Sequence, residues 1–166
     1  MNKKVLVIGL ILAFAVLTFP ISAVFADSPM IEVSGTISSG ASSQTVVKEV
    51  GENTFLFLTT ASTWNRAATG GIYGKTVGSQ TWIVHTGSAD PHITVNVEIV
   101  FTTATVDGKT GTMTIEMEMI SFPLHRVDNH GTWRIKDAAG GLAGLHGEGA
   151  WLSVPNRYEG KVHFSS

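Results

Sequence analysis

The chain has 166 residues, of which 13 are acidic and 11 basic, with six histidines and no cysteine. The lack of cysteine excludes a disulfide framework and a zinc site with thiolate ligands. The slight excess of acidic residues argues against a nucleic-acid-binding protein, which normally carries a basic stripe.

The N-terminus has the three regions of an export signal. Residues 2–4 form a short positive segment, residues 5–17 are almost continuously apolar, and residues 20–26 end in small side chains typical of a cleavage site. We therefore interpret residues 1–26 as a signal peptide and residues 27–166 as a single domain. The protein is expected to be secreted or to lie in the cell envelope. In the alternative interpretation the segment is not cleaved and is an N-terminal membrane anchor, the only membrane contact that we expect.

The chain after Ala26 has the composition of a β-protein. It contains 13 Val, 9 Ile and 18 Thr against 6 Leu and 10 Ala, and β-branched residues favour a pleated sheet. Turn residues separate short runs of this kind, which predicts an all-β fold: a closed antiparallel barrel of about eight strands. We expect helix only as a turn around residues 140–145. The predicted strands are residues 31–38, 45–50, 54–60, 71–77, 80–86, 92–105, 110–120, 131–136, 150–154 and 158–164.

The clearest hairpin joins residues 92–105 to residues 110–120. Both arms carry their apolar residues at odd positions, so directly opposed residues must sum to an even number if the apolar sets are to share a face. A two-residue turn at Asp107-Gly108 gives an odd sum. We therefore expect a three-residue loop or a glycine bulge at this turn, with Gly108 or Gly111 at positive φ.

The apolar face of this hairpin is predicted to lie inside, since the opposite face carries the charges. Three methionines on that face form an adaptable wall, either for a ligand or simply as core packing. The interior is therefore expected to be apolar and to bind, if anything, an apolar small molecule. The candidate ligand-binding residues are Trp82, Val97, Phe101, Met113, Met117, Met119 and Trp133.

Three carboxylates, Glu98, Glu116 and Glu118, fall on the polar face and are the best candidates for acid/base chemistry or a divalent cation site. The alternative is a solvated outer face on which Arg134 and Lys136 neutralise them across the strands. The six histidines have no short metal-binding spacing. We therefore expect no metal site.

The glycine-rich segment GGLAGLHGEG at 140–149 lacks the order of a phosphate-binding loop and is predicted to be a tight turn. Together with GKTGTMT at 108–114, GTWRI at 131–135 and YEGKVHF at 158–164, it resembles small uncharacterised prokaryotic proteins related to the allene oxide cyclase-like barrel. The resemblance covers residues 81–164. It implies an eight-stranded, calycin-like antiparallel barrel, similar also to dirigent proteins, that needs no cofactor.

Two functions remain open at this point. The first is a non-catalytic exported barrel that binds an apolar small molecule or has a structural role at the cell envelope. The alternative is a cofactor-free cyclase or isomerase that works by confinement, with an inward polar residue such as His85 or Tyr158 as the chemical group. Fold resemblance alone does not decide between them.

The signal-peptide interpretation predicts cleavage between Ala26 and Asp27. N-terminal sequencing of the protein recovered from its native host should begin at Asp27. Intact Met1 in the membrane fraction would instead identify an uncleaved anchor.

Overall fold

The computed structural model describes residues 29–122 and 129–165, so the predicted signal peptide, residues 1–26, lies outside the described residues. Within these ranges no helix is long and apolar enough to cross a membrane. The strands are β1 (Ile31–Val50), β2 (Asn53–Arg66), β3 (Tyr73–His85), β4 (His92–Val106), β5 (Lys109–Ser121), β6 (His130–Gly140), β7 (Leu145–Ser153) and β8 (Asn156–Phe164).

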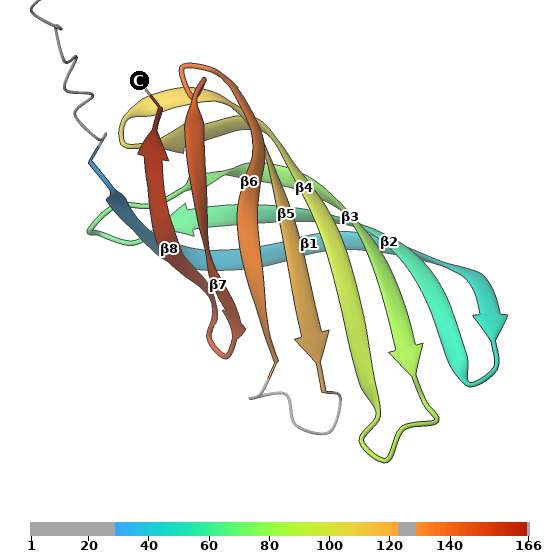
Figure 1. Ribbon diagram of the computed structural model, residues 1–166. Coiled ribbons are helices and arrows are strands. Elements are labelled where there is room, and N and C mark those ends of the chain that lie inside the picture. Colours follow the sequence, from blue (N-terminus) through green and yellow to red (C-terminus); the bar gives the residue numbers. More distant parts are fainter. Residues whose placement is uncertain (1–28, 123–128, 166) are drawn as a thin grey trace, which may run out of the picture.

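The eight strands form one antiparallel sheet that closes on itself. Each strand pairs with its neighbours in the chain, and residues 31–36 of β1 also pair with β8. Figure 1 shows the resulting ring, which we call the barrel. The described residues contain no helix. The prediction of an all-β, antiparallel, eight-stranded fold is confirmed.

Two predicted breaks between strands are absent. The predicted break at residues 39–44 lies within β1, where pairing to β2 continues through a β-bulge between Ser39 and Ser42. The predicted break at residues 78–79 lies within β3, because Gly78 is paired on one side with Thr60 and on the other with Ile99. Ladder hydrogen bonds, from both neighbouring strands at Gly78 and from β2 alone in β1, therefore outweigh the local turn preference of Ser and Gly.

The hairpin of β4 and β5 has the predicted even-sum register in its long central part, where Val97 lies opposite Met117. Its turn, however, contains only Asp107 and Gly108, with φ of 49° and 75°. Positive φ at both central residues is the geometry that matches the twist of a hairpin. The positive φ of Gly108 was predicted, whereas the predicted three-residue loop is wrong.

A β-bulge inside β4 restores the register instead. The pairing shifts by one residue between Phe101 and Ala104, because β4 contains one extra residue there. Beyond the bulge the inward positions of β4 change from odd to even numbers. Ala104 and Val106 are accordingly fully buried.

One end of the barrel interior is filled by four large side chains, Trp64, Phe101, Trp133 and Tyr158, none more than 2% exposed. The ring centroids of Trp64 and Tyr158 are 4.5 Å apart, and Phe101 meets Trp64 edge-on at 5.4 Å. Trp133 meets Tyr158 edge-on at 6.4 Å. We call this region the packed end. Its burial agrees with the prediction that the aromatic face of the sheet lies inside.

Glycines on β7 and β8 make room for the indole of Trp133. A Cβ atom placed on Gly149 or Gly160 would lie 2.6 Å or 2.5 Å from Cζ2 of Trp133, closer than van der Waals contact allows. The indole Nε1 donates a hydrogen bond of 3.1 Å to the carbonyl oxygen of Ala150. Trp133 is therefore fixed by its shape and by its one polar atom.

Tyr158 ties β8 to the segment between β2 and β3. Its hydroxyl accepts a hydrogen bond of 2.8 Å from the backbone N–H of Ile72 and donates one of 2.5 Å to the carbonyl oxygen of Ile72. Burial raises the pKa of Tyr158 to about 12, while the hydrogen bond to Ile72 acts in the opposite direction. The hydroxyl therefore stays protonated and serves as a two-way link.

The glycine-rich segment forms the predicted tight turn, over residues 141–144, between β6 and β7. Gly140 and Gly144 have φ of 68° and 75°, values that favour glycine. A strand follows the turn, whereas a phosphate-binding loop leads into a helix.

Replacing Tyr158, which links β8 to Ile72, should destabilise the barrel. Tyr158→Phe leaves both backbone groups of Ile72 unpaired, at a cost of about 1–3 kcal/mol in the free energy of unfolding measured with urea. Because the pKa in the folded state is above the ordinary value of 10.0, ionisation favours the unfolded chain. The contribution of Tyr158 to the free energy of unfolding is therefore complete below pH 10. It is lost as the pH rises through about 12.

The exposed Tyr73 provides the matched control. Tyr73→Phe should leave the free energy of unfolding nearly unchanged and should keep the loss of stability between pH 10 and 12. If Tyr158→Phe kept that alkaline loss in full, the assignment of the loss to Tyr158 would be wrong.

Candidate ligand-binding site

Beyond the packed end, the barrel interior has two walls of different chemistry. On β4 and β5 the inward side chains are apolar, as the odd-position pattern predicts, and include Val97, Ile99 and Met117. On β1, β2 and β3 the inward side chains are largely polar, so the predicted wholly apolar interior is wrong. These polar residues are Ser39, Thr60, Ser62, Thr76 and Gln80.

The polar wall follows from strand alternation in β2. Leu58 and Trp64 are both buried, and side chains two apart on a strand share a face. Thr60 and Ser62 therefore face inward between them. Their small size leaves space that larger apolar residues would have filled.

That space is an inner cavity of about 100 Å³ between the two walls. Trp64 forms its floor, where the cavity meets the packed end. One water molecule occupies roughly 10–15 Å³ by this kind of measure, so the cavity has room for part of a small organic molecule. Among the described residues that line it, none is charged.

A second cavity, of about 520 Å³, lies at the open end of the barrel and shares Trp151 and Asn156 with the inner cavity. We call it the mouth cavity. Its remaining described lining includes the apolar side chains Trp82, Ile93 and Val154. The two cavities therefore adjoin at Trp151 and Asn156.

The open end exists because β1 is much longer than β8. The two strands pair only as far as Thr36 on β1, and β1 then continues to Val50 beside β2 alone. Figure 1 shows β1 and β2 extending well beyond the β7–β8 hairpin. The ring is therefore complete around the packed end and open on one side at the mouth.

Asn156 holds the edge of this opening. Its Nδ2 donates a hydrogen bond of 2.6 Å to the carbonyl oxygen of Ile37, the first β1 residue past the β8 pairing. Its Oδ1 accepts one of 2.7 Å from Nε1 of Trp151. This link satisfies the backbone where the ladder stops and positions the Trp151 ring between the two cavities.

A chain of hydrogen bonds also orders the polar wall. Nε1 of Trp82 donates to Oε1 of Gln80 at 2.8 Å, and Nε2 of Gln80 donates to Oγ1 of Thr60 at 3.1 Å. Thr76 donates from its hydroxyl to the carbonyl oxygen of Ser62 at 3.4 Å. The wall is thus fixed before any ligand arrives.

The predicted ligand-binding residues divide into three groups. Val97, Met117 and Met119 line the inner cavity, and Trp82 lines the mouth cavity. The others lie in or beside the packed end and line neither cavity. These are Phe101, Met113 and Trp133.

His85 and Tyr158, the two residues proposed as the chemical group of a cyclase or isomerase, have other roles in the structure. His85 was predicted to face inward, but it lies on the outer face. Its ring nitrogens contact Oδ1 of Asn53 at 3.0 Å and Oγ1 of Thr94 at 3.3 Å, and its ring stacks on His92. The strand alternation that turns Trp82 inward turns His85 outward. Tyr158 is buried, but Ile72 occupies its hydroxyl.

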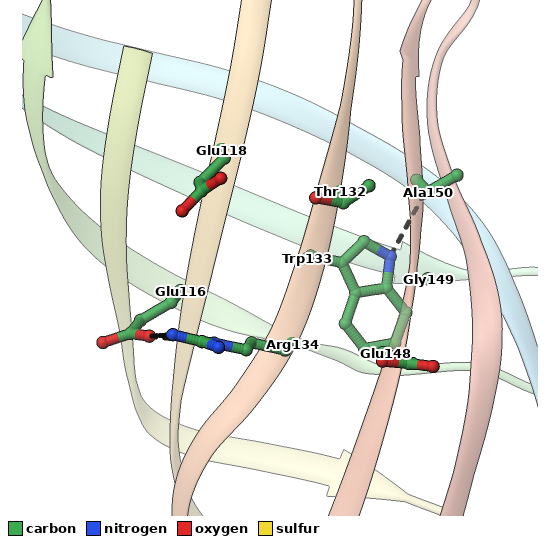
Figure 2. Close-up of a pocket in the computed structure, with 8 residues that line it drawn as sticks. All are labelled: Glu116, Glu118, Thr132, Trp133, Arg134, Glu148, Gly149 and Ala150. Atoms are coloured by element: carbon green, nitrogen blue, oxygen red, sulfur yellow. Dashed lines mark hydrogen bonds and ion pairs between the residues drawn. The ribbon is translucent and has the colours of Figure 1, made fainter.

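The candidate carboxylates lie on the outer face, where Glu116 and Glu118 line a groove of about 470 Å³ over β5, β6 and β7. Figure 2 shows the Arg134 guanidinium beside the Glu116 carboxylate, with Glu118 apart from this pair. Nη2 of Arg134 lies 2.7 Å from Oε2 of Glu116. Lys136 bridges Glu98 at 2.8 Å and Glu116 at 2.9 Å. The predicted neutralisation of Glu98 and Glu116 across the strands is confirmed.

These pairs also fix the charge states. Hydrogen bonds from Lys136 and then Arg134 lower the pKa of Glu116. Hydrogen bonds to Glu98 and Glu116 raise the pKa of Lys136. A carboxylate held in its ionised form by two cations is poorly suited to act as a general acid.

Across residues 29–122 and 129–165, no three His, Asp or Glu side chains gather where they could hold a metal ion. Comparison with family models, curated proteins and solved structures gives no match to this chain. The resemblance to the allene oxide cyclase-like barrel therefore stays a prediction.

The two faces of β5 can be distinguished by a pair of variants. Met117→Asp places an unpaired carboxylate inside the barrel, which costs several kcal/mol, and should abolish the cooperative urea transition. Glu116→Gln removes only exposed ion pairs, so it should shift the transition little, and less still in high salt. A tolerated Met117→Asp together with a severely destabilised Glu116→Gln would contradict this assignment of faces.

Proposed function

We propose that this protein is an exported barrel that binds an apolar small molecule at its open end. The observation that carries the proposal is an inner cavity, uncharged in its described lining, that adjoins a mouth cavity at Trp151 and Asn156. The two volumes, about 100 and 520 Å³, together fall in the roughly 300–1,000 Å³ range of small-molecule sites.

The chemistry of the walls supports the same proposal. Met117 and Met119 give the β5 wall unbranched, polarizable side chains that adapt to different ligand shapes. Trp82 and Trp151 supply large apolar surfaces at the mouth while each indole N–H is bonded within the protein. A ligand can therefore gain apolar contact there without breaking a hydrogen bond.

Export rests on the N-terminal signal, and a structural role at the cell envelope remains the alternative for a non-catalytic barrel. The relation to the allene oxide cyclase-like barrel belongs to the proposal as well. It is supported by eight antiparallel strands closed by pairing of the first with the last.

Binding is favoured over a cofactor-free cyclase or isomerase activity by the lining itself. The described residues of both cavities are neutral, and the Tyr158 hydroxyl is bonded to Ile72 on both sides. Confinement is available to such a site, whereas none of its described lining residues carries a charge that could transfer a proton.

A single glycine allows the proposal to be tested. Gly78 lines the inner cavity, and a Cβ atom placed there meets its nearest neighbours at 3.6–3.7 Å, an ordinary contact. Gly78→Val should therefore preserve the fold and fill the cavity. We expect it to weaken binding of the fluorescent apolar probe N-phenyl-1-naphthylamine by about tenfold or more, because the added side chain occupies space that the probe needs.

Ser79→Val is the matched control, because the next residue of β3 faces outward and should leave probe binding unchanged. Native mass spectrometry of the protein from its own host would then identify any co-purifying ligand. Absence of probe binding by the wild-type protein would refute the proposal and favour a structural role. Conversion of a bound ligand to an isomer would favour the cyclase alternative.

A further inference from the structure

We propose that the ligand of the inner cavity is a neutral molecule with a hydrocarbon tail and an oxygen acceptor, such as a ketone, ester or ether oxygen, at its buried end. The acceptor oxygen accepts a hydrogen bond from Nε1 of Trp64, and the tail runs toward the mouth. This inference rests on the proposed binding function and specifies the class of ligand.

The four tryptophans differ in one respect. Trp82 donates to Gln80, Trp133 to the carbonyl oxygen of Ala150, and Trp151 to Asn156. Nε1 of Trp64 is buried and has no hydrogen-bond acceptor among the described residues. An unpaired N–H inside a protein is unfavourable, and most such groups are satisfied by a partner.

Trp64 is also in the right place for a ligand to supply that partner. It is 1% exposed and forms the floor of the inner cavity. Its ring is held by Tyr158 on one side and by the edge-on contact with Phe101. The donor is therefore part of a rigid floor, which favours recognition of one particular atom of a ligand.

The polar wall supplies a further donor among the residues that line the same cavity. Gln80 uses its carbonyl oxygen to accept from Trp82 and its amide nitrogen to donate to Thr60. Since Oγ1 of Thr60 accepts that bond, its hydroxyl hydrogen is left to donate. The wall and the floor therefore both match an acceptor on the ligand.

The lining also favours a ligand without charge. A carboxylate or an ammonium group in the inner cavity would be buried without a counter-charge among the described lining residues, and that arrangement is strongly unfavourable. Opposite the donors, Val97, Ile99 and Met117 offer only apolar contact. A neutral head and a hydrocarbon tail fit these two walls together.

The test compares three eight-carbon-chain probes that displace N-phenyl-1-naphthylamine: 2-octanone, its isosteric alkene 2-methyl-1-octene, and octanoate at pH 7. Trp64→Phe removes the indole N–H and keeps an aromatic ring. We expect this variant to bind 2-octanone about fivefold more weakly, the effect of one neutral hydrogen bond, and to bind the alkene unchanged. Octanoate should bind more weakly than 2-octanone to the wild-type protein.

Trp133→Phe is the matched control, because it removes an indole N–H that is already bonded to Ala150 and lies outside the cavity. It should leave the ratio of ketone to alkene affinity unchanged. If Trp64→Phe does not fold, the indole N–H resonance of Trp64 in the wild-type protein gives the same information. It should move on addition of 2-octanone and not on addition of the alkene.

The outcomes separate this inference from the proposed function. Equal loss of ketone and alkene binding in Trp64→Phe, or an indole resonance that does not respond to the ketone, would overturn the inference and leave apolar binding intact. Tightest binding of octanoate would also overturn it. Failure of all three probes and of N-phenyl-1-naphthylamine to bind the wild-type protein would overturn the proposed function.

Discussion

Unequal filling of the barrel is the constraint on which the rest of this structure depends. At one end Trp64, Phe101, Trp133 and Tyr158 pack against one another, and glycines on β7 and β8 leave the space that the Trp133 indole occupies. Protein interiors are close-packed, so side-chain volume determines where space remains. At the other end Thr, Ser and Gly replace the aromatic residues on β2 and β3, and the barrel holds a cavity instead of a core.

The packed end also explains how the opening is tolerated. Pairing of β1 with β8 closes the ring only at residues 31–36, beside the packed end, where Tyr158 adds its link to Ile72. Past Thr36, strand β1 relies on β2 for its ladder, and Asn156 satisfies the carbonyl oxygen of Ile37. The stability of one end therefore permits an accessible site at the other, an arrangement common in ligand-binding barrels.

The sequence predicted the features that depend on the alternation of apolar and polar residues along a strand. It did not predict those that depend on how neighbouring strands pair. The faces of β4 and β5 were predicted because their apolar residues alternate over many positions, and the ion pairs of Arg134 and Lys136 followed from those faces. The bulge that sets the register was predicted at the turn but lies between Phe101 and Ala104. Asp107-Gly108 is a favourable hairpin turn by itself, so the extra residue is accommodated within β4.

The polar wall was missed for a different reason. Thr60 and Ser62 lie in register with Leu58 and Trp64, a signal that was present in the sequence. However, the predicted strand ended at Thr60, so Ser62 and Trp64 were not assigned to a face. Trp64, the floor of the cavity, could not be found by composition, because its importance lies in a missing hydrogen-bond partner.

The central claim, a packed end beside an open one, is tested most directly by the methionine methyl resonances of β5. Met117 and Met119 line the inner cavity, whereas the buried Met113 lies opposite Phe101 beside the packed end. Titration with an aromatic apolar probe should shift the methyl resonances of Met117 and Met119 through ring currents and leave that of Met113 in place. Equal shifts at all three, or a shift at Met113 alone, would contradict the account.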